Sequence, residues 1–257
     1  FAKSLALRLK CSWVCKLKEG RKMFNEFQNV NNLSNWYKDE QLSFDKKLIE
    51  LRYRAIKSKF TGKVGLELGP AEGTMTQYII NDFEELTVVE ASSMLLNLMP
   101  EYENLYKVNS LFEDFSPVKK FDTIIMEHIL EHVENPVDLI KRAKDWLSPN
   151  GKIFIGVPNG DSLHRLVGVK MGLLADKCSL NDRDHALGHR RVYTRDTLKS
   201  DIEACELTIL ELGGVFIKPV SNKQIDDHWT EEMIEAFFEL GKDFPELCAE
   251  LYCVCAK

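Results

Sequence analysis

The sequence lacks the features that mark several common classes of protein. No apolar run approaches the ~20 residues of a membrane-spanning helix. The net charge of -6 gives no broad positive field for nucleic acid. The seven cysteines form no Cys-x-x-Cys pair and no zinc-finger spacing. These absences argue against a membrane span, a nucleic-acid partner and a disulfide framework, and they favour a cytoplasmic protein with reduced thiols.

Two nucleotide-binding motifs are also missing. The sequence has neither the dinucleotide fingerprint Gly-x-Gly-x-x-Gly nor the Gly-Lys-Ser/Thr ending of a phosphate loop after its first apolar strand. With 257 residues, 44% of them hydrophobic and 29% charged, the chain fits one α/β domain with additions or two small domains.

The N-terminal region divides into two parts. Residues 1–22 form a basic leader with seven Lys or Arg against one acid, and they begin with Phe, so Met23 is a candidate natural start. The leader is consistent with an artificial extension, a fragment of a precursor or a basic amphipathic arm. Residues 23–60 carry an apolar stripe at helical spacing, which predicts either an N-terminal helical lid or a helix that only packs.

The first strand leads into a glycine loop. Residues 64–68 are apolar except for Glu67 and predict a buried strand, Gly69 and Gly73 permit a tight turn, and a helix is expected from Thr74. Glu67 lies two residues before Gly69, where its carboxylate would repel a pyrophosphate and attract a cationic amino group. The segment therefore predicts a ligand with a positive charge.

A second strand over residues 86–90 ends in Glu90, and its position supports a ribose contact. In open α/β sheets, ligands bind beyond the carboxyl ends of strands, and an acid about twenty residues after a glycine loop can accept the ribose hydroxyls. Ser92 or Ser93 is expected to cap the following helix. Further strands are predicted at 105–108, 121–126, 152–159, 207–217 and 249–257, and residues 127–133 are expected to enter a helix.

Two regions together resemble a known family. Glu67-x-Gly69-Pro70-Ala71-Glu72-Gly73 resembles motif I of the class I S-adenosylmethionine-dependent methyltransferases, with Ala71 in place of the central glycine. Within residues 121–159, the Phe-Asp, Leu-Glu-His-Val, Leu-Ser-Pro-Asn-Gly-Lys and Val-Pro-Asn elements are similar to small-molecule enzymes of quinone biosynthesis and sugar modification. The resemblance covers residues 60–160 best.

The resemblance implies a fold and a cofactor. The fold is α/β, a doubly wound, seven-stranded, mostly parallel, Rossmann-like sheet over residues 61–257, with the last strand antiparallel between its neighbours. The cofactor is S-adenosylmethionine, and the product is S-adenosylhomocysteine. The residues implied in cofactor binding are Glu67, Gly69, Pro70, Gly73, Glu90, Ala91, Ser92, Ser110, Leu111, Phe112 and Glu127.

The acceptor side is expected in an insertion at residues 160–194, because loops on a rigid scaffold commonly carry specificity. Gly188 to Thr194 matches a Gly-His-x-Arg-x-Tyr/Phe-Thr segment of similar enzymes. The candidate catalytic residues are His128, His185 and His189. Arg190 or Arg191 would bind an anionic part of the acceptor, or they and the histidines brace the insertion against the sheet.

A metal site is a competing interpretation of residues 127–133. His128 and His132 would share one face of a helix, with Glu127 and Glu131 nearby. Some quinone-pathway relatives bind a divalent ion through a Glu and a His here, and Glu131-His132 fits part of that pattern. However, methyl transfer from a sulfonium needs no metal, so none is predicted.

The predicted function is methyl transfer to an oxygen or nitrogen of a small molecule. A sugar or surface-polysaccharide precursor is the first expectation for the acceptor, and a quinone-like phenol is the second. A non-catalytic S-adenosylmethionine-binding regulator and a nicotinamide-dependent oxidoreductase are the alternatives. The oligomeric state is open, and a homodimer is one option.

Overall fold

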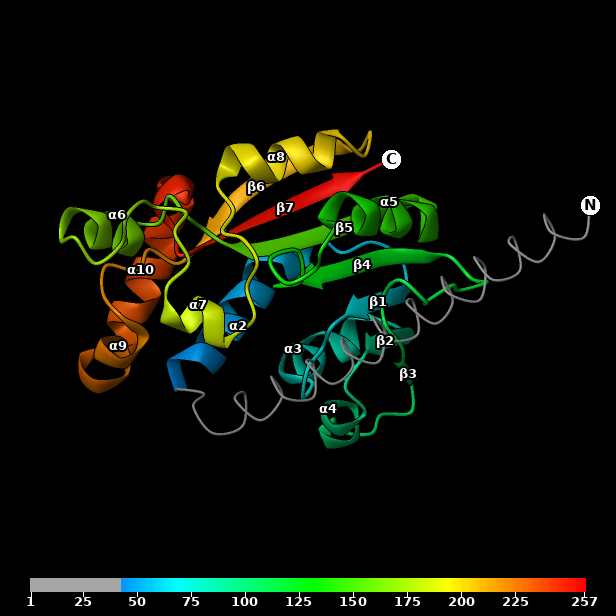
Figure 1. The fold of residues 1–257 in the computed structure, drawn as a ribbon. Helices are drawn as coiled ribbons and strands as arrows, with labels where there is room; N and C mark the ends of the chain where they lie inside the picture. Colours follow the sequence, from blue (N-terminus) through cyan, green and yellow to red (C-terminus); the bar gives the residue numbers. More distant parts are fainter. Residues whose placement is uncertain (1–42) are drawn as a thin grey trace, which may run out of the picture.

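A computed structural model describes residues 43–257. The basic leader and the first part of the predicted lid lie outside the described residues. The described chain forms a seven-stranded sheet with the order β3-β2-β1-β4-β5-β7-β6, and helices cover both of its faces (Figure 1). The predicted seven-stranded doubly wound fold is confirmed.

The strands match the predicted segments closely. Their bounds are β1 Val64–Leu68, β2 Glu85–Glu90, β3 Leu105–Asn109, β4 Phe121–Glu127, β5 Leu147–Pro158, β6 Thr208–Val215 and β7 Glu250–Ala256. The α-helices are α2 Ser43–Ile56, α3 Thr74–Ile79, α4 Ser93–Leu98, α5 Pro136–Trp146, α6 Leu163–Lys170, α7 Asp182–Ala186, α8 Arg195–Glu203, α9 Asn222–His228 and α10 Glu231–Asp243.

The direction of the strands creates one functional edge. Strands β1 to β5 pair in parallel, and β7 pairs antiparallel with both β5 and β6. The expected antiparallel last strand between its neighbours is therefore confirmed. Because β6 again runs parallel to β5, the carboxyl ends of β1, β4, β5 and β6 face the same side as the first residue of β7. In an open α/β sheet this edge is where ligands bind.

Alternating residues of each strand fill two apolar layers. Ile124 of β4 and Ile155 of β5 face one cluster that includes side chains of α5 and α8. Ile125 and Phe154 face the opposite cluster, which includes side chains of α3 and the end of α2. Figure 1 shows α5 and α8 on one face of the sheet and α3 on the other. Because successive residues of these strands face apolar clusters on opposite sides of the sheet, the strand sequences are nearly continuous apolar runs.

Helix α2 is fastened across the carboxyl edge by polar contacts. Arg54 forms two hydrogen bonds with Glu235 of α10, at 2.5 and 2.7 Å, and the backbone N–H of Phe44 donates to Asp226 of α9 at 2.8 Å. Phe44 also packs against Phe216, with ring centroids 5.1 Å apart. Helix α2 thus covers the edge, a position that the lid and the packing interpretations share, so its role as a lid stays a prediction.

One predicted element is wrong. Residues 128–134 form turns rather than a helix, and the next helix begins at Pro136. His128 has a φ of 55°, which is a left-handed conformation that cannot start an α-helix. The premise that His128 and His132 share a helical face is therefore also wrong. Among the described residues, no helix is long and apolar enough to cross a membrane.

The packing around β7 is open to a stability test. Leu251 is 1% exposed and belongs to the cluster beneath α5 and α8. We expect Leu251→Ala to lower the free energy of unfolding by about 2–5 kcal/mol, since it leaves a cavity. Urea unfolding measures this value, and Leu210→Ala on β6, 53% exposed, should change it by less than about 0.5 kcal/mol. Equal effects would contradict the assigned register of these strands.

Candidate active site

A cavity of about 310 Å³ lies at the carboxyl edge of the sheet, beneath α2. Its walls come from the glycine loop, the segments after β4, β5 and β6, the insertion, and the first residues of β7. Residues that line it include Arg52, Glu67, Gly69, Pro70, Glu127, His128, His132, His164, Asp184, His189, Lys218 and Glu250. Segments far apart in the sequence thus form a single site.

The glycine loop has the backbone conformation that the sequence predicted. Gly69 has a φ of 62°, and a Cβ atom there would lie 2.3 Å from Ile129 Cδ1. Gly73 has a φ of 87° and is the N-cap of α3. Both positions require glycine. Ala71, with a φ of 50°, also adopts a left-handed conformation, so the residue that replaces the family's central glycine keeps a backbone conformation suited to glycine.

Glu67 presents a buried carboxyl group to the cavity. Its side chain is on β1, the residue is 3% exposed, and Thr76 Oγ1 donates a hydrogen bond to it at 2.6 Å. Burial raises the pKa of Glu67 to about 8, although the hydrogen bond from Thr76 opposes this shift. An ammonium group in the cavity would favour the ionised form. The site therefore fits the predicted cationic ligand.

Glu90 lies at the end of β2 and is held against the glycine loop. Its carboxylate accepts hydrogen bonds from the backbone N–H of Ala71 at 3.2 Å and of Ser92 at 2.8 Å. Burial raises its pKa despite these bonds. Ser92 caps α4 as predicted, since its hydroxyl accepts from Leu95 N. Glu90 does not line the cavity, so its ribose contact stays a prediction.

The residues predicted near adenine lie next to the same loop. Asn109 donates to the carbonyl groups of Glu90 and Ala91, and the hydroxyl of Ser110 donates to the carbonyl of Leu111. Phe112 Cζ would lie 3.4 Å from a Cβ at Gly69. These polar groups are engaged locally, which leaves the faces of Leu111 and Phe112 for an apolar contact; this role too stays a prediction.

The centre of the cavity holds a network of buried charges. Arg52 of α2 lies 3.0 Å from Glu250 of β7 and 3.9 Å from Glu127 of β4. Glu127 has two buried carboxylate oxygens without a hydrogen-bond partner among the described residues, and burial raises its pKa although Arg52 and His128 oppose this. Burial would also raise the pKa of Glu250, but Arg52 and His128 lower it to about 2.

His128 lies between two carboxylates. Its Nδ1 is 3.2 Å from Glu131 Oε1, and its Nε2 is 3.3 Å from Glu250 Oε1. Burial and Arg52 disfavour the charged imidazole, but the two carboxylates outweigh them and raise the pKa of His128 to about 9. His128 is therefore a cation at neutral pH and is poorly suited to accept a proton.

The insertion brings a different histidine to the cavity, next to a carboxylate. His189 Nδ1 lies 3.0 Å from Asp184 Oδ1, and both residues line the cavity. Burial would raise the pKa of Asp184, but His189, the N–H of Asn181 and Arg165 lower it to about 2. The resulting carboxylate orients the imidazole. His185, in contrast, is exposed and does not line the cavity.

The two candidate arginines bind backbone groups. Arg190 Nε donates to the carbonyl of His132 at 2.7 Å. Arg191 donates to the carbonyls of Leu130 and Val133 at 2.6 and 2.5 Å. These bonds fasten the insertion to the turns after β4, as the bracing interpretation expected. Neither guanidinium lines the cavity.

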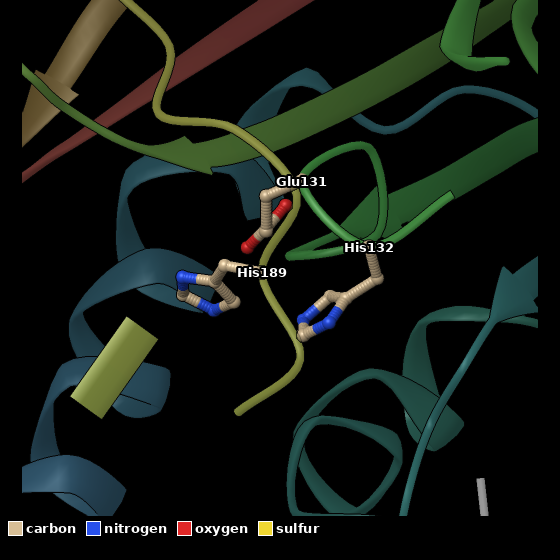
Figure 2. Close-up of side chains that lie close together, drawn as sticks. All are labelled: Glu131, His132 and His189. Atoms are coloured by element: carbon tan, nitrogen blue, oxygen red, sulfur yellow. The ribbon is translucent and has the colours of Figure 1, made fainter. Parts of the chain in front are cut away.

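Glu131, His132 and His189 gather at one point, as Figure 2 shows. One possible ligand atom from each lies within 4.8 Å of the others, so the group could hold a metal ion. The rings of His132 and His189 meet edge to face, with centroids 4.8 Å apart. Burial lowers the pKa of His132 to about 4 although Glu131 opposes it, so this ring is neutral. The prediction that no metal is bound stays untested.

Comparisons with known proteins identify the family. A family model described as a methyltransferase domain matches residues 39–212, well over half of the chain. The chain belongs to this family and is an S-adenosylmethionine-dependent methyltransferase. S-adenosylmethionine is its cofactor, and the buried carboxyl of Glu67 beside the glycine loop suits the cofactor's ammonium group.

Curated relatives are distant. The chain is 22% identical over 184 residues to a ubiquinone biosynthesis O-methyltransferase of Coxiella burnetii, with 68% of this chain and 76% of that protein covered. It is 24% identical over 120 residues to the mitochondrial ubiquinone biosynthesis O-methyltransferase of Schizosaccharomyces pombe. That match spans only 44% of each protein.

Solved structures share the fold. An S-adenosylmethionine-dependent methyltransferase from Mesorhizobium loti has a TM-score of 0.60 and 14% identity, covering 80% of this chain and 98% of that one. The plantazolicin methyltransferase BpumL, solved with S-adenosylhomocysteine, has a TM-score of 0.54 and 16% identity, covering 93% of this chain and 90% of that one. At these identities the likeness concerns the fold alone.

Glu67 makes stability depend on pH. The pKa of Glu67 is about 8 in the folded protein, against an ordinary value of 4.5, so protonation of Glu67 stabilises the folded state. This contribution to the free energy of unfolding is complete below pH 4.5 and is lost as the pH rises to 8. The free energy of unfolding of the wild type should therefore fall relative to Glu67→Gln between pH 5 and 8, by more than ~1 kcal/mol. Urea unfolding at several pH values measures the difference, and a constant difference would show that Glu67 ionises normally.

Proposed function

We propose that this protein methylates a hydroxyl oxygen of a small molecule and that His189 is the general base. The observation that carries the proposal is the pairing of His189 with Asp184 in the cavity that the glycine loop also lines. The second ring nitrogen of His189 is then the one that accepts a proton, since Nδ1 faces the carboxylate of Asp184.

The cofactor, when bound, supplies an electrophilic methyl group on a sulfonium. The chain's own residues hold and orient the reactants. Glu67 would bind the amino group, the glycine loop would allow close approach of the backbone, and Glu90 would exchange its bonds to the loop for the ribose hydroxyls. Helix α2 would exclude water from the cavity. Alignment of this kind supplies about 7 kcal/mol or more in well-oriented reactions.

The base favours oxygen over nitrogen as the acceptor atom. A neutral amine already presents its lone pair, whereas a hydroxyl gains more from losing its proton during attack. The names of two relatives above describe O-methylation in ubiquinone biosynthesis, although another relative is an N-methyltransferase, the (S)-coclaurine enzyme of Thalictrum flavum, at 25% identity over 146 residues. These names lead us to place a phenolic hydroxyl ahead of a sugar precursor.

The proposed setting is a cytoplasmic enzyme with a small-molecule acceptor and no nucleic-acid partner. The acidic net charge of -6 supports the absence of nucleic acid. The family model describes a methyltransferase, which favours catalysis over a purely regulatory role and over the nicotinamide-dependent alternative. A homodimer remains one option for the assembly.

His189→Gln tests the base. We expect kcat for methylation of a catechol to fall by about 10²–10⁴, while the affinity for S-adenosylhomocysteine changes less than threefold, because His189 lies on the insertion rather than beside the glycine loop. Transfer of labelled methyl groups and calorimetry measure the two quantities.

The control for this test is His228→Gln, at an exposed position that ends α9, which should keep wild-type kcat. A fully active His189→Gln would remove His189 from the mechanism. If His185→Gln loses as much activity as His189→Gln, the general base cannot be assigned to His189 in preference to His185, and the proposal is contradicted.

A further inference from the structure

Lys218 follows β6 in the sequence and lies at the end of the cavity next to that strand. Because β6 runs parallel to β5, the segment after it reaches the carboxyl edge of the sheet beside the start of β7. Its backbone is fixed there, since Ala249 N donates to the carbonyl of Phe216 at 2.7 Å and Ile217 N donates to the carbonyl of Phe237 at 3.3 Å. The side chain of Lys218 lines the cavity.

The ammonium group of Lys218 is paired with a neutral amide. Its Nζ donates to Asn222 Oδ1 at 2.7 Å, and Asn222 Nδ2 in turn donates to Asp45 Oδ1 at 2.5 Å. Within residues 43–257, no carboxylate oxygen lies within 4.0 Å of Lys218 Nζ, the distance limit for an ion pair. An ammonium has three donor hydrogens, so two remain for a ligand.

The nearby carboxylates are already matched with other cations. Glu250 pairs with Arg52 and His128, Asp45 pairs with Arg183, and Asp184 pairs with Arg165 and His189. Lys218 is thus a cation of this wall that forms no direct ion pair among the described residues, although it is linked through Asn222 to Asp45. Burial lowers its pKa to about 8, with Glu250 opposing and Arg183 adding to the shift, so it is still mainly charged at pH 7. A buried charge without a partner is costly.

His164 adds a second polar group that lacks a partner. It is the second residue of α6 and lines the cavity, and its Nδ1 is buried without a hydrogen-bond partner among the described residues. Burial and Lys218 lower its pKa to about 3, so the ring is neutral. A neutral imidazole can donate or accept a hydrogen bond beside an ionic contact.

We propose that the methyl acceptor carries a carboxylate, which binds to Lys218 Nζ beside His164. This inference rests on the proposed function and specifies its substrate class. One ammonium group with free donor hydrogens and no direct ion pair matches one negative charge, which favours a carboxylate over a doubly charged phosphate. The contact lies at the β6 end of the edge, whereas Glu67 lies on β1 with β4, β5 and β7 in between. The anionic group therefore orients the acceptor from the end opposite the cofactor's ammonium.

Matched probes test the carboxylate contact. Protein saturated with S-adenosylhomocysteine is titrated at pH 7 with 3,4-dihydroxybenzoate and with the uncharged 3,4-dihydroxybenzamide. The wild type should bind the acid at least tenfold more tightly than the amide. In Lys218→Met, which keeps the length of the side chain, this preference should disappear through a loss of about tenfold or more in affinity for the acid, with the affinity for the amide unchanged.

Two further variants control for structural effects. Lys223→Met removes an exposed lysine of α9 that pairs with Asp227 and should keep the full preference, while Lys218→Arg should keep part of it. Equal affinities for both probes in the wild type, a preference that survives Lys218→Met, or no binding of either probe would overturn the carboxylate assignment. Failure of S-adenosylhomocysteine itself to bind would overturn the proposed function, and this assignment with it.

Discussion

The ion pair between Arg52 and Glu250 holds the site together. Glu250 begins β7, and because that strand is antiparallel, its first residue lies at the carboxyl edge of the sheet. There its carboxylate meets Arg52 of α2 at 3.0 Å and His128, after β4, at 3.3 Å. One side chain thus connects the sheet, the covering helix and the turn that carries the charged imidazole. Removing either partner of a buried pair costs about 3–5 kcal/mol.

The ionisable residues of the cavity differ in their charge states. The charges of Glu250 and Glu131 keep His128 protonated, so it acts as a fixed cation. Asp184 of the insertion lies 3.0 Å from His189 and orients the ring of the proposed general base. Glu67 on β1 forms no ion pair within residues 43–257, and burial raises its pKa to about 8, so its carboxyl is mainly neutral at pH 7. Three regions of one cavity therefore suit three tasks, namely charge balance, proton removal and binding of an ammonium.

Much of the fold could be predicted from the sequence because its cause is local. The apolar runs at 64–68, 121–126 and 152–158 are strands buried on both faces, and Gly69 and Gly73 have the left-handed backbone that the glycine loop suggested. The prediction that residues 127–133 enter a helix was wrong because His128 has a left-handed backbone conformation. Its N–H donates to the carbonyl of Gly156, and its ring lies beside Glu250, more than a hundred residues away. A local pattern cannot register such a tertiary contact.

The site was predictable in part for the same reason. Glu67 and His189 were found through short motifs, and both line the cavity. Arg52, Asp184, Lys218 and Glu250 were missed, since each belongs to a helix, loop or strand with no motif of its own. Only the strand order brings them together.

The central claim is that Glu67, neutral in the free protein, ionises when it binds the ammonium end of the cofactor. Calorimetric titration with S-adenosylhomocysteine at pH 7, in two buffers of different ionisation enthalpy, counts the protons released on binding. We predict release of close to one proton by the wild type and of almost none by Glu67→Gln, which should bind more weakly. Binding without proton release by the wild type, or no binding at all, would contradict the account.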